Sequence, residues 1–375
     1  MQKANHPRGF RFLSKLIIVV GLISAAVAYQ APAQTITTDP VGFITLTATG
    51  KTTTAGLYNF WSLGMTQVPV LRGMVGSIVN TAGNQVTISN QTLTAGQFNE
   101  ANTVGSSTEP SYFVEFTSGS GAGLLDDIVS NDTAAIYTAT DDSSMESVGT
   151  TIKIYPHWTI GTVFGPQNQA GLLGGSSSSG ADNIEVWNPV AQSYGSATYY
   201  YKTTTTLGGS GWRSSASSSI NVSNTVLYVD QGIIVDRKTA AGNVNVLLVG
   251  GVKLGPTMSV IYGTNSAGLG FTYAGNVFPA PVTLGTSGLY TGNNTTGLNG
   301  GSSGSGADEV EVWAASGQTY STYYYKTTTS LGGSGWRSTG SSSIDCSTNQ
   351  VPLGDIVRIQ RKIKGAFTWT MPQPF

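Results

Sequence analysis

The sequence predicts an all-β fold, in which a small N-terminal β-barrel or β-sandwich domain precedes two tandem β-sandwich-like repeats. Apolar and polar residues alternate with period two along many short segments, and Gly, Asn and Asp separate these segments. Between residues 40 and 155, no segment has the periodicity of a long amphipathic helix. Hydrophobic residues make up 39% of the chain and aromatic residues 10%, so its 49 glycines indicate turns rather than disorder.

The chain begins with a segment typical of a Sec signal peptide. Basic residues precede the apolar run 16–28, and small residues suited to signal peptidase follow it. Cleavage after Ala28 or after Ala33 fits this pattern, and we expect the second, which removes residues 1–33. The apolar run is shorter than the roughly 20 residues that span a bilayer, so we expect no transmembrane helix after signal removal. The mature protein is expected to be secreted or to reside in the cell envelope, in the periplasm or at the outer surface.

Between residues 40 and 155, the alternation predicts one strand after another. Ile44, Leu46 and Ala48 alternate with threonine. Segments 78–79 and 86–88 flank Gly83-Asn84, as the strands of a hairpin do. We therefore expect an N-terminal β domain at 34–156.

An internal repeat fills the C-terminal half. Its longest matches pair 180–187 with 306–313, 199–202 with 323–326, and 207–213 with 331–337. A weaker similarity pairs Gly161, Val163 and Phe164 with Gly275, Val277 and Phe278. It places the starts of the copies near residues 158 and 271, and we expect the first repeat at 157–255 and the second at 256–375. The Ser/Gly runs 174–180 and 300–306 precede a strand at the same place in each copy, so we expect them to be loops of the module.

The two copies serve as two samples of one module, because side chains alternate across a strand. Ile184 stays aliphatic as Val310 and is expected to face the core, whereas Ile234, which becomes Arg358, is expected at a surface. The retained aromatic and charged residues form a predicted ligand or partner face. They are Glu185, Trp187, Tyr200, Trp212 and Arg213 in the first copy, and Glu311, Trp313, Tyr324, Trp336 and Arg337 in the second.

Two interpretations of this predicted face remain open. Exposed rings would stack on sugars or on a partner chain, with Arg and Glu fixing the orientation by hydrogen bonds. Alternatively, the rings fill a second sheet or the contact between the copies, which is the commoner use of large aromatic side chains. We favour the packing interpretation.

Few residues suit catalysis, cofactor binding or metal binding. His157 is the only histidine after signal removal, which leaves too few for a multi-histidine metal site. Glu185 and Glu311 are equivalent residues of separate modules rather than two carboxylates across one scissile bond. The acidic pairs at 126–127 and 141–142 lack the spacing of calcium loops and are expected to be solvated turns. We predict no catalytic residue, no cofactor and no metal, and therefore no enzyme.

Charge and cysteine content narrow the function further. The formal net charge is −1 and only 10% of residues are charged, so nucleic acid is not an expected partner. Cys346 is the only cysteine, which excludes an intramolecular disulfide. Val222 stands at the equivalent position of the first copy, so we expect Cys346 to be buried as a small apolar residue.

Three segments resemble a family of secreted proteins from verrucomicrobial bacteria that have no assigned activity. The segments are TDPVGF at 38–43, YFVEFTSG at 112–119 and PHWTIGT at 156–162. The resemblance covers the N-terminal half of the mature chain best. It implies no reaction and supplies no catalytic residues. Some members carry a C-terminal sorting tail with a hydrophobic segment, which this sequence does not show.

These features favour an exported, non-enzymatic structural or adhesive β protein of the cell envelope or extracellular matrix. Its expected partners are glycans, other cell-surface components or a second copy of itself. The alternative is a carbohydrate-binding module or polysaccharide-processing protein. A second alternative is an outer-membrane β-barrel, suggested by the alternation of Phe367, Trp369 and Met371 and by the final Phe375. Two prolines near this end count against that alternative, since proline donates no ladder hydrogen bond.

Overall fold

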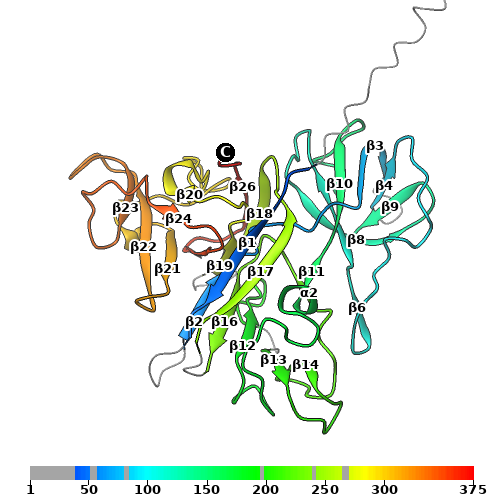
Figure 1. Ribbon diagram of the computed structural model, residues 1–375. Helices are drawn as coiled ribbons and strands as arrows, with labels where there is room; N and C mark the ends of the chain where they lie inside the picture. Colours follow the sequence, from blue (N-terminus) through cyan, green and yellow to red (C-terminus); the bar gives the residue numbers. More distant parts are fainter. Residues whose placement is uncertain (1–38, 51–56, 80–83, 195–197, 239–241, 264–269) are drawn as a thin grey trace, which may run out of the picture. The chain divides into compact units, whose positions relative to one another are not determined.

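The secondary structure of the described residues is almost entirely β, with many loops and little helix, as the alternating sequence predicts (Figure 1). The computed structural model describes residues 39–50, 57–79, 84–194, 198–238, 242–263 and 270–375. The predicted signal peptide, residues 1–33, lies outside the described residues. Residues 40–375 form one unit, in which α2 (Ile160–Phe164) is the only α-helix of the described ranges. None of their helices has the length and apolarity needed to cross a membrane.

A closed six-stranded barrel forms from the strands that follow residue 70. In barrel order these are β10 (Thr151–Pro156), β3 (Leu71–Val79), β4 (Gln85–Ile88), β9 (Ala135–Thr138), β8 (Leu125–Asn131) and β7 (Tyr112–Phe116). The predicted hairpin is confirmed, since β3 and β4 pair antiparallel. Closure leaves no open sheet edge, and the barrel has its own core around Phe98, Phe116 and Ile128. A short hairpin, β5 (Asn102–Val104) with β6 (Ser107–Glu109), leaves the barrel.

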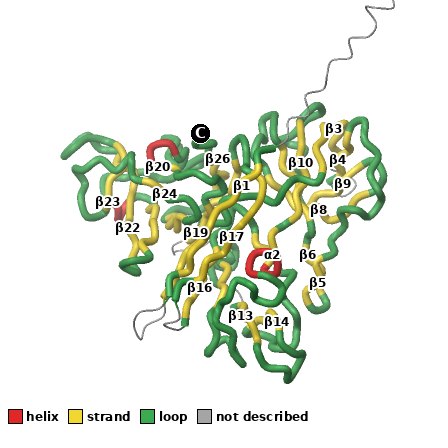
Figure 2. Tube along the Cα trace, viewed as in Figure 1, coloured by secondary structure: helices red, strands yellow, loops and turns green. Residues whose placement is uncertain are grey.

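The first copy of the repeat builds a five-stranded antiparallel sheet (Figure 2). Its order is β14 (Gly211–Ser214), β13 (Tyr199–Lys202), β12 (Asn183–Val186), β16 (Ile233–Arg237) and β2 (Leu57–Trp61). Two ribbons accompany it: β1 (Val41–Ala48) with β17 (Val244–Gly251), and β11 (Trp158–Thr159) with β15 (Val226–Leu227).

The second copy repeats this arrangement strand for strand. Its sheet has the order β19 (Gly270–Gly275), β25 (Ile356–Arg361), β21 (Glu309–Ala314), β22 (Thr319–Lys326) and β23 (Gly335–Ser338). The matching ribbons are β18 (Thr257–Ile261) with β26 (Phe367–Met371), and β20 (Val282–Thr283) with β24 (Gln350–Val351). Two 3-10 helices, η1 (Leu284–Thr286) and η2 (Gly304–Gly306), lie in its loops.

The first copy starts earlier than the sequence comparison predicts. β1 pairs with β17 and β2 pairs with β16, just as β18 pairs with β26 and β19 with β25. The first copy therefore begins near residue 41 rather than 158, and the barrel is inserted between its second and third strands. The expected domain 34–156 combines the barrel with β1 and β2, which belong to the first copy of the repeat. Sequence similarity missed this because β2 and β19 share their pairing but almost no residues.

The second copy begins with β18 at Thr257, which lies at the start of the expected range 256–375 and before residue 271, where the weaker similarity begins. Gly161 corresponds to Gly285 and not to Gly275. The backbone N–H of Gly161 donates to Ser223 at 2.7 Å, and that of Gly285 donates to Ser347 at 2.8 Å. A threonine caps the helical turn in both cases, Thr159 before α2 and Thr283 before η1.

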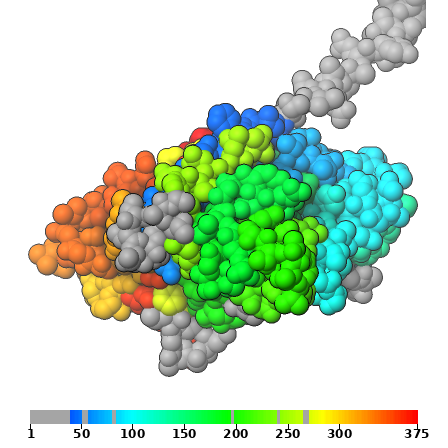
Figure 3. Space-filling model, turned by 60° about the horizontal axis from the view of Figure 1, so that its bottom comes forward, coloured from blue at the N-terminus to red at the C-terminus, as the bar shows by residue number. Residues whose placement is uncertain are grey.

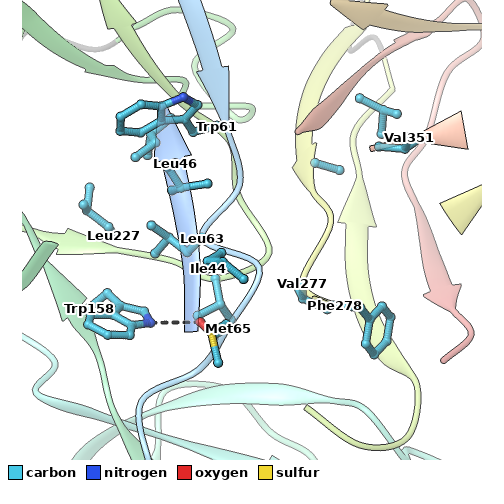
Figure 4. Close-up of a cluster of buried hydrophobic side chains, with 14 of the residues drawn as sticks. Ile44, Leu46, Trp61, Leu63, Met65, Trp158, Leu227, Val277, Phe278 and Val351 are labelled. Atoms are coloured by element: carbon cyan, nitrogen blue, oxygen red, sulfur yellow. Dashed lines mark hydrogen bonds between the residues drawn. The ribbon is translucent and has the colours of Figure 1, made fainter. Parts of the chain in front are cut away.

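One continuous hydrophobic core joins the two copies (Figure 4). Ile44 and Leu46 of β1 enter it beside Trp61, and the indole Nε1 of Trp158 donates to the carbonyl of Met65 at 2.9 Å. Period-two alternation also decides the faces of β26, where Phe367 and Trp369 are buried while Thr368 is exposed. Cys346 is buried in the same core, as predicted.

Candidate functional site

The residues of the predicted face do not share one surface. Trp212 and Trp336 are 0% and 4% exposed in the core, and Tyr200 and Tyr324 are each 2% exposed. Arg213 follows Trp212 directly in β14, so the two side chains point to opposite faces of the sheet. These residues are packed in both copies rather than gathered on an outer face.

Trp187 and Trp313 lie at the contact between the copies. The indole Nε1 of Trp187 donates to the carbonyl of Phe271 at 2.9 Å, and that of Trp313 donates to the carbonyl of Tyr58 at 3.0 Å. Tyr58 in β2 and Phe271 in β19 occupy the same place in their sheets, opposite Asp236 and Gln360. Each copy thus holds the first sheet strand of the other through an equivalent tryptophan.

Two glutamines strengthen this reciprocal contact. The side chain of Gln192 bonds both the N–H and the C=O of Phe271, and that of Gln318 bonds the same two groups of Tyr58. A contact in which equivalent residues exchange the same bonds has the form of a twofold, isologous interface.

Ile234 is 2% exposed, so the prediction that it lies at a surface is wrong. It packs in the same contact with Phe60 and Ile356. Arg358, its counterpart, lies 4.0 Å from the centre of the Tyr320 ring and pairs with Glu311. An apolar and a cationic residue both fit this position, because an aromatic ring packs against an apolar side chain and also attracts a cation to its face.

Glu185 has no such partner among the ion pairs of the described residues and is half-buried, and burial raises the pKa of its carboxyl group.

The remaining charged residues of the predicted face hold loops in place. Arg213 donates to the carbonyls of Gly208, Gly209 and Ser210, and Arg337 donates to the equivalent carbonyls of the second copy. These glycine-rich loops present Leu207 and Leu331, each 76% exposed, at a positive φ of 48° and 47°. A buried arginine is therefore used to fix loop shape.

His157 lines a cavity of about 170 Å³ together with residues of the barrel and of the first copy. Its Nε2 lies 2.9 Å from Oδ1 of Asp127, and the hydroxyl of Tyr228 donates to Oδ2 of the same carboxylate at 2.8 Å. The lining contains no Ser, Thr or Cys that could act as a nucleophile beside this pair. The cluster ties β8 of the barrel to the first copy.

The acidic pairs are not uniformly solvated, contrary to expectation. Asp126 and Asp142 are 8% and 4% exposed, while Asp141 is exposed. Burial, and then the neighbouring Asp126, raise the pKa of Asp142 to about 8. Within the described ranges, no three His, Cys, Asp or Glu side chains are arranged to hold a metal ion.

Two open clefts of the second copy adjoin at Tyr290. One, of about 490 Å³, is lined by Asn293, Asn294 and Asn299. The other, of about 550 Å³, is lined by Tyr325, Trp336, Arg337 and Asp345. Trp336 and Arg337 could be predicted from the sequence because both copies share them, whereas Tyr290 has no matching tyrosine in the first copy. Tyr290 lies in a stretch that is two residues longer in the second copy, and a search for differences would have found it.

Comparisons with family models, with curated proteins and with solved structures found no match for this chain. The arrangement of the side chains is therefore the basis on which its function is inferred.

Proposed function

We propose that this chain is an exported, non-enzymatic structural or adhesive β protein of the cell envelope or extracellular matrix, which associates with a second copy of itself. The observation that carries this proposal is an apolar outer face on the β1–β17 ribbon. Val41 and Phe43 of β1 are 65% and 72% exposed, and Leu247 and Val249 of β17 are 59% and 64% exposed. Phe43 lies directly opposite Val249 in the ladder. The two strands run side by side in Figure 1, and Figure 3 shows these blue and yellow-green segments at the surface.

Folding of the module does not require apolar side chains at the outward positions of both ribbon strands. On the matching ribbon of the second copy, Thr368 and Thr370 of β26 point outward. They lie opposite Val260 and Met258 of β18, so the same fold forms with threonine on one strand of the ribbon. A contiguous exposed apolar patch that folding does not require is typical of a protein contact surface.

A second copy of the chain is the occupant that fits this ribbon. The outward positions of both strands carry only Val, Phe, Leu, Thr and Asn, so an uncharged, flat partner surface is needed. Another β1–β17 ribbon supplies such a surface, and a twofold axis would place Phe43 of each chain over the aliphatic side chains of the other. Sedimentation of the mature protein at increasing concentration tests this association, and N-terminal sequencing of the exported protein tests cleavage before Gln34.

The second candidate function is carbohydrate binding, and the two clefts at Tyr290 favour it. Their linings combine aromatic rings with amide, carboxylate and guanidinium groups, which together suit the apolar faces and hydroxyl groups of sugars. Trp187 and Trp313, which the sequence suggested for this role, are engaged between the copies. Titration calorimetry of the mature protein with neutral oligosaccharides tests this function.

A further inference from the structure

A stack of three aromatic rings forms the wall between the two clefts. The rings of Tyr290 and Tyr325 lie nearly parallel, with centroids 3.5 Å apart, and Tyr325 meets Trp336 edge-on at 5.7 Å. Trp336 is 4% exposed and anchors the stack in the core, while Tyr290 borders both clefts. Tyr290 is therefore a rigid aromatic platform at the surface, supported from behind.

The first copy lacks both the platform and an open indole donor. There, the Nε1 of Trp212 donates to the carbonyl of Gly165 at 2.8 Å. In the second copy, the longer loop carries Tyr290, and among the described residues no acceptor meets the Nε1 of Trp336. Trp336 lines the cleft beside Tyr290. The same tryptophan thus closes a loop in one copy and leaves a donor for a ligand in the other.

Polar side chains line the clefts on both sides of Tyr290. The exposed side chain of Asn294 has no partner among the described residues, and the backbone carbonyl of Asn294 accepts a hydrogen bond from the buried Arg361 at 2.6 Å. On the other side, Nη1 of Arg337 lies 3.1 Å from the carboxylate of Asp345, and the side chain of Asp345 remains 64% exposed. The backbone of Asn294 and the carboxylate of Asp345 are therefore held in position before any ligand arrives, which reduces the entropy lost on binding.

We propose that these adjoining clefts of the second copy bind a neutral oligosaccharide, with one sugar ring stacked on Tyr290 and its neighbours in the two clefts. The apolar face of a pyranose matches the tyrosine ring, and its hydroxyls match the indole N–H of Trp336, the amide of Asn294 and the carboxylate of Asp345. Arg337 balances the charge of Asp345, so the cleft favours an uncharged sugar over an acidic one. This inference rests on the carbohydrate-binding function proposed above.

The test is titration calorimetry of the mature protein with cello-, xylo-, manno- and laminari-oligosaccharides. Tyr290→Ala should weaken binding about tenfold or more, since it removes the stacking surface. Trp336→Phe keeps the ring and removes the donor, and should weaken binding about fivefold. Trp212→Phe is the matched control: it removes the same N–H from the first copy and should leave the affinity unchanged.

The possible failures can be told apart. Binding that Tyr290→Ala and Trp336→Phe leave unchanged would place the sugar elsewhere and overturn the cleft, while the carbohydrate function would stand. If the unmodified protein binds none of these oligosaccharides, both the function and the cleft are overturned. Thermal unfolding of each variant shows whether a lost affinity reflects a lost fold.

Discussion

The indole N–H of Trp187 donates to the backbone carbonyl of Phe271 at 2.9 Å, and an equivalent hydrogen bond forms elsewhere in the chain. In that bond, the indole N–H of Trp313 donates to the backbone carbonyl of Tyr58 at 3.0 Å. The residues that most suggested an exposed ligand face therefore join the two copies, and each copy contributes one anchor and one strand.

Loss of either indole donor should destabilise the protein by a similar amount. Trp187→Phe and Trp313→Phe should each lower the free energy of unfolding by about 1 kcal/mol, because each removes one hydrogen bond and retains an aromatic ring. Urea unfolding measures the change. Val190→Thr, at a position that is 66% exposed in the same hairpin as Trp187, should have almost no effect. Strong destabilisation by one tryptophan variant and none by the other would contradict an equivalent, twofold contact.

Arg361 should be required for the stability of the fold as long as the buried carboxylate of Asp308 is present. Its Nη1 lies 3.3 Å from the carboxylate of Asp308, and both side chains are almost fully buried. Arg361→Met should cost about 3–5 kcal/mol, because it leaves a buried carboxylate without a counter-charge. Adding Asp308→Asn should recover part of that loss in the same denaturation assay. A double variant as unstable as the single one would show that the carboxylate is not the source of the cost.

Stability should fall as the pH rises from about 4 to about 8. Burial raises the pKa of Asp142 to about 8, so over this range the folded state keeps a proton that the unfolded chain releases. The stabilisation is complete below the unfolded pKa and is lost as the pH passes through the folded pKa. Asp142→Asn should therefore raise the free energy of unfolding at about pH 8 by about 2 kcal/mol or more and flatten the profile.

The exposed neighbour Asp141 is the control for this experiment. Asp141→Asn should keep the pH dependence of the unmodified protein. Denaturant midpoints of the unmodified protein and of the two variants, measured at about pH 5 and about pH 8, show whether Asp142 causes the pH dependence. An Asp142→Asn profile as steep as that of the unmodified protein would assign the dependence to another carboxyl group. Asp355, whose pKa burial raises to about 6, is the next candidate.

Self-association should depend on the outer face of the β1–β17 ribbon. Replacing Phe43 and Val249 by threonine should raise the dissociation constant of the dimer at least about tenfold, since two apolar side chains would no longer be buried. The fold should survive, because the second copy tolerates threonine on its ribbon. Sedimentation equilibrium gives the constant, and Val260→Thr on β18 serves as the control. A monomeric unmodified protein at all concentrations would refute the association.

The alternation of apolar and polar residues, and the Gly, Asn and Asp residues between the alternating segments, were enough to predict the fold class. The hairpin of β3 and β4 and the inward positions of β1 also followed from local pattern. The burial of Cys346 was predicted by comparing it with Val222 of the other copy. Each of these features depends on neighbours along the chain or on a matched residue, which is information that a single sequence contains.

The start of the first copy and the cleft at Tyr290 did not follow from the sequence. Pairing between β2 and β16 joins residues more than a hundred and seventy positions apart, as in the register of Asn59 with Val235. Backbone hydrogen bonds make that pairing, and they leave no side-chain signature. The search for shared residues also favoured buried positions, because packing keeps residues alike between copies, and so it directed attention away from Tyr290.

The sequence by itself therefore determined the strand pattern, the duplication and the residue types that the module needs. Only the tertiary structure decided which strands of the two copies meet, which rings are buried between them, and which donor of the second copy faces an open cleft. The physical reason is that alternation fixes only the two faces of a strand, whereas burial of a face depends on what packs against it.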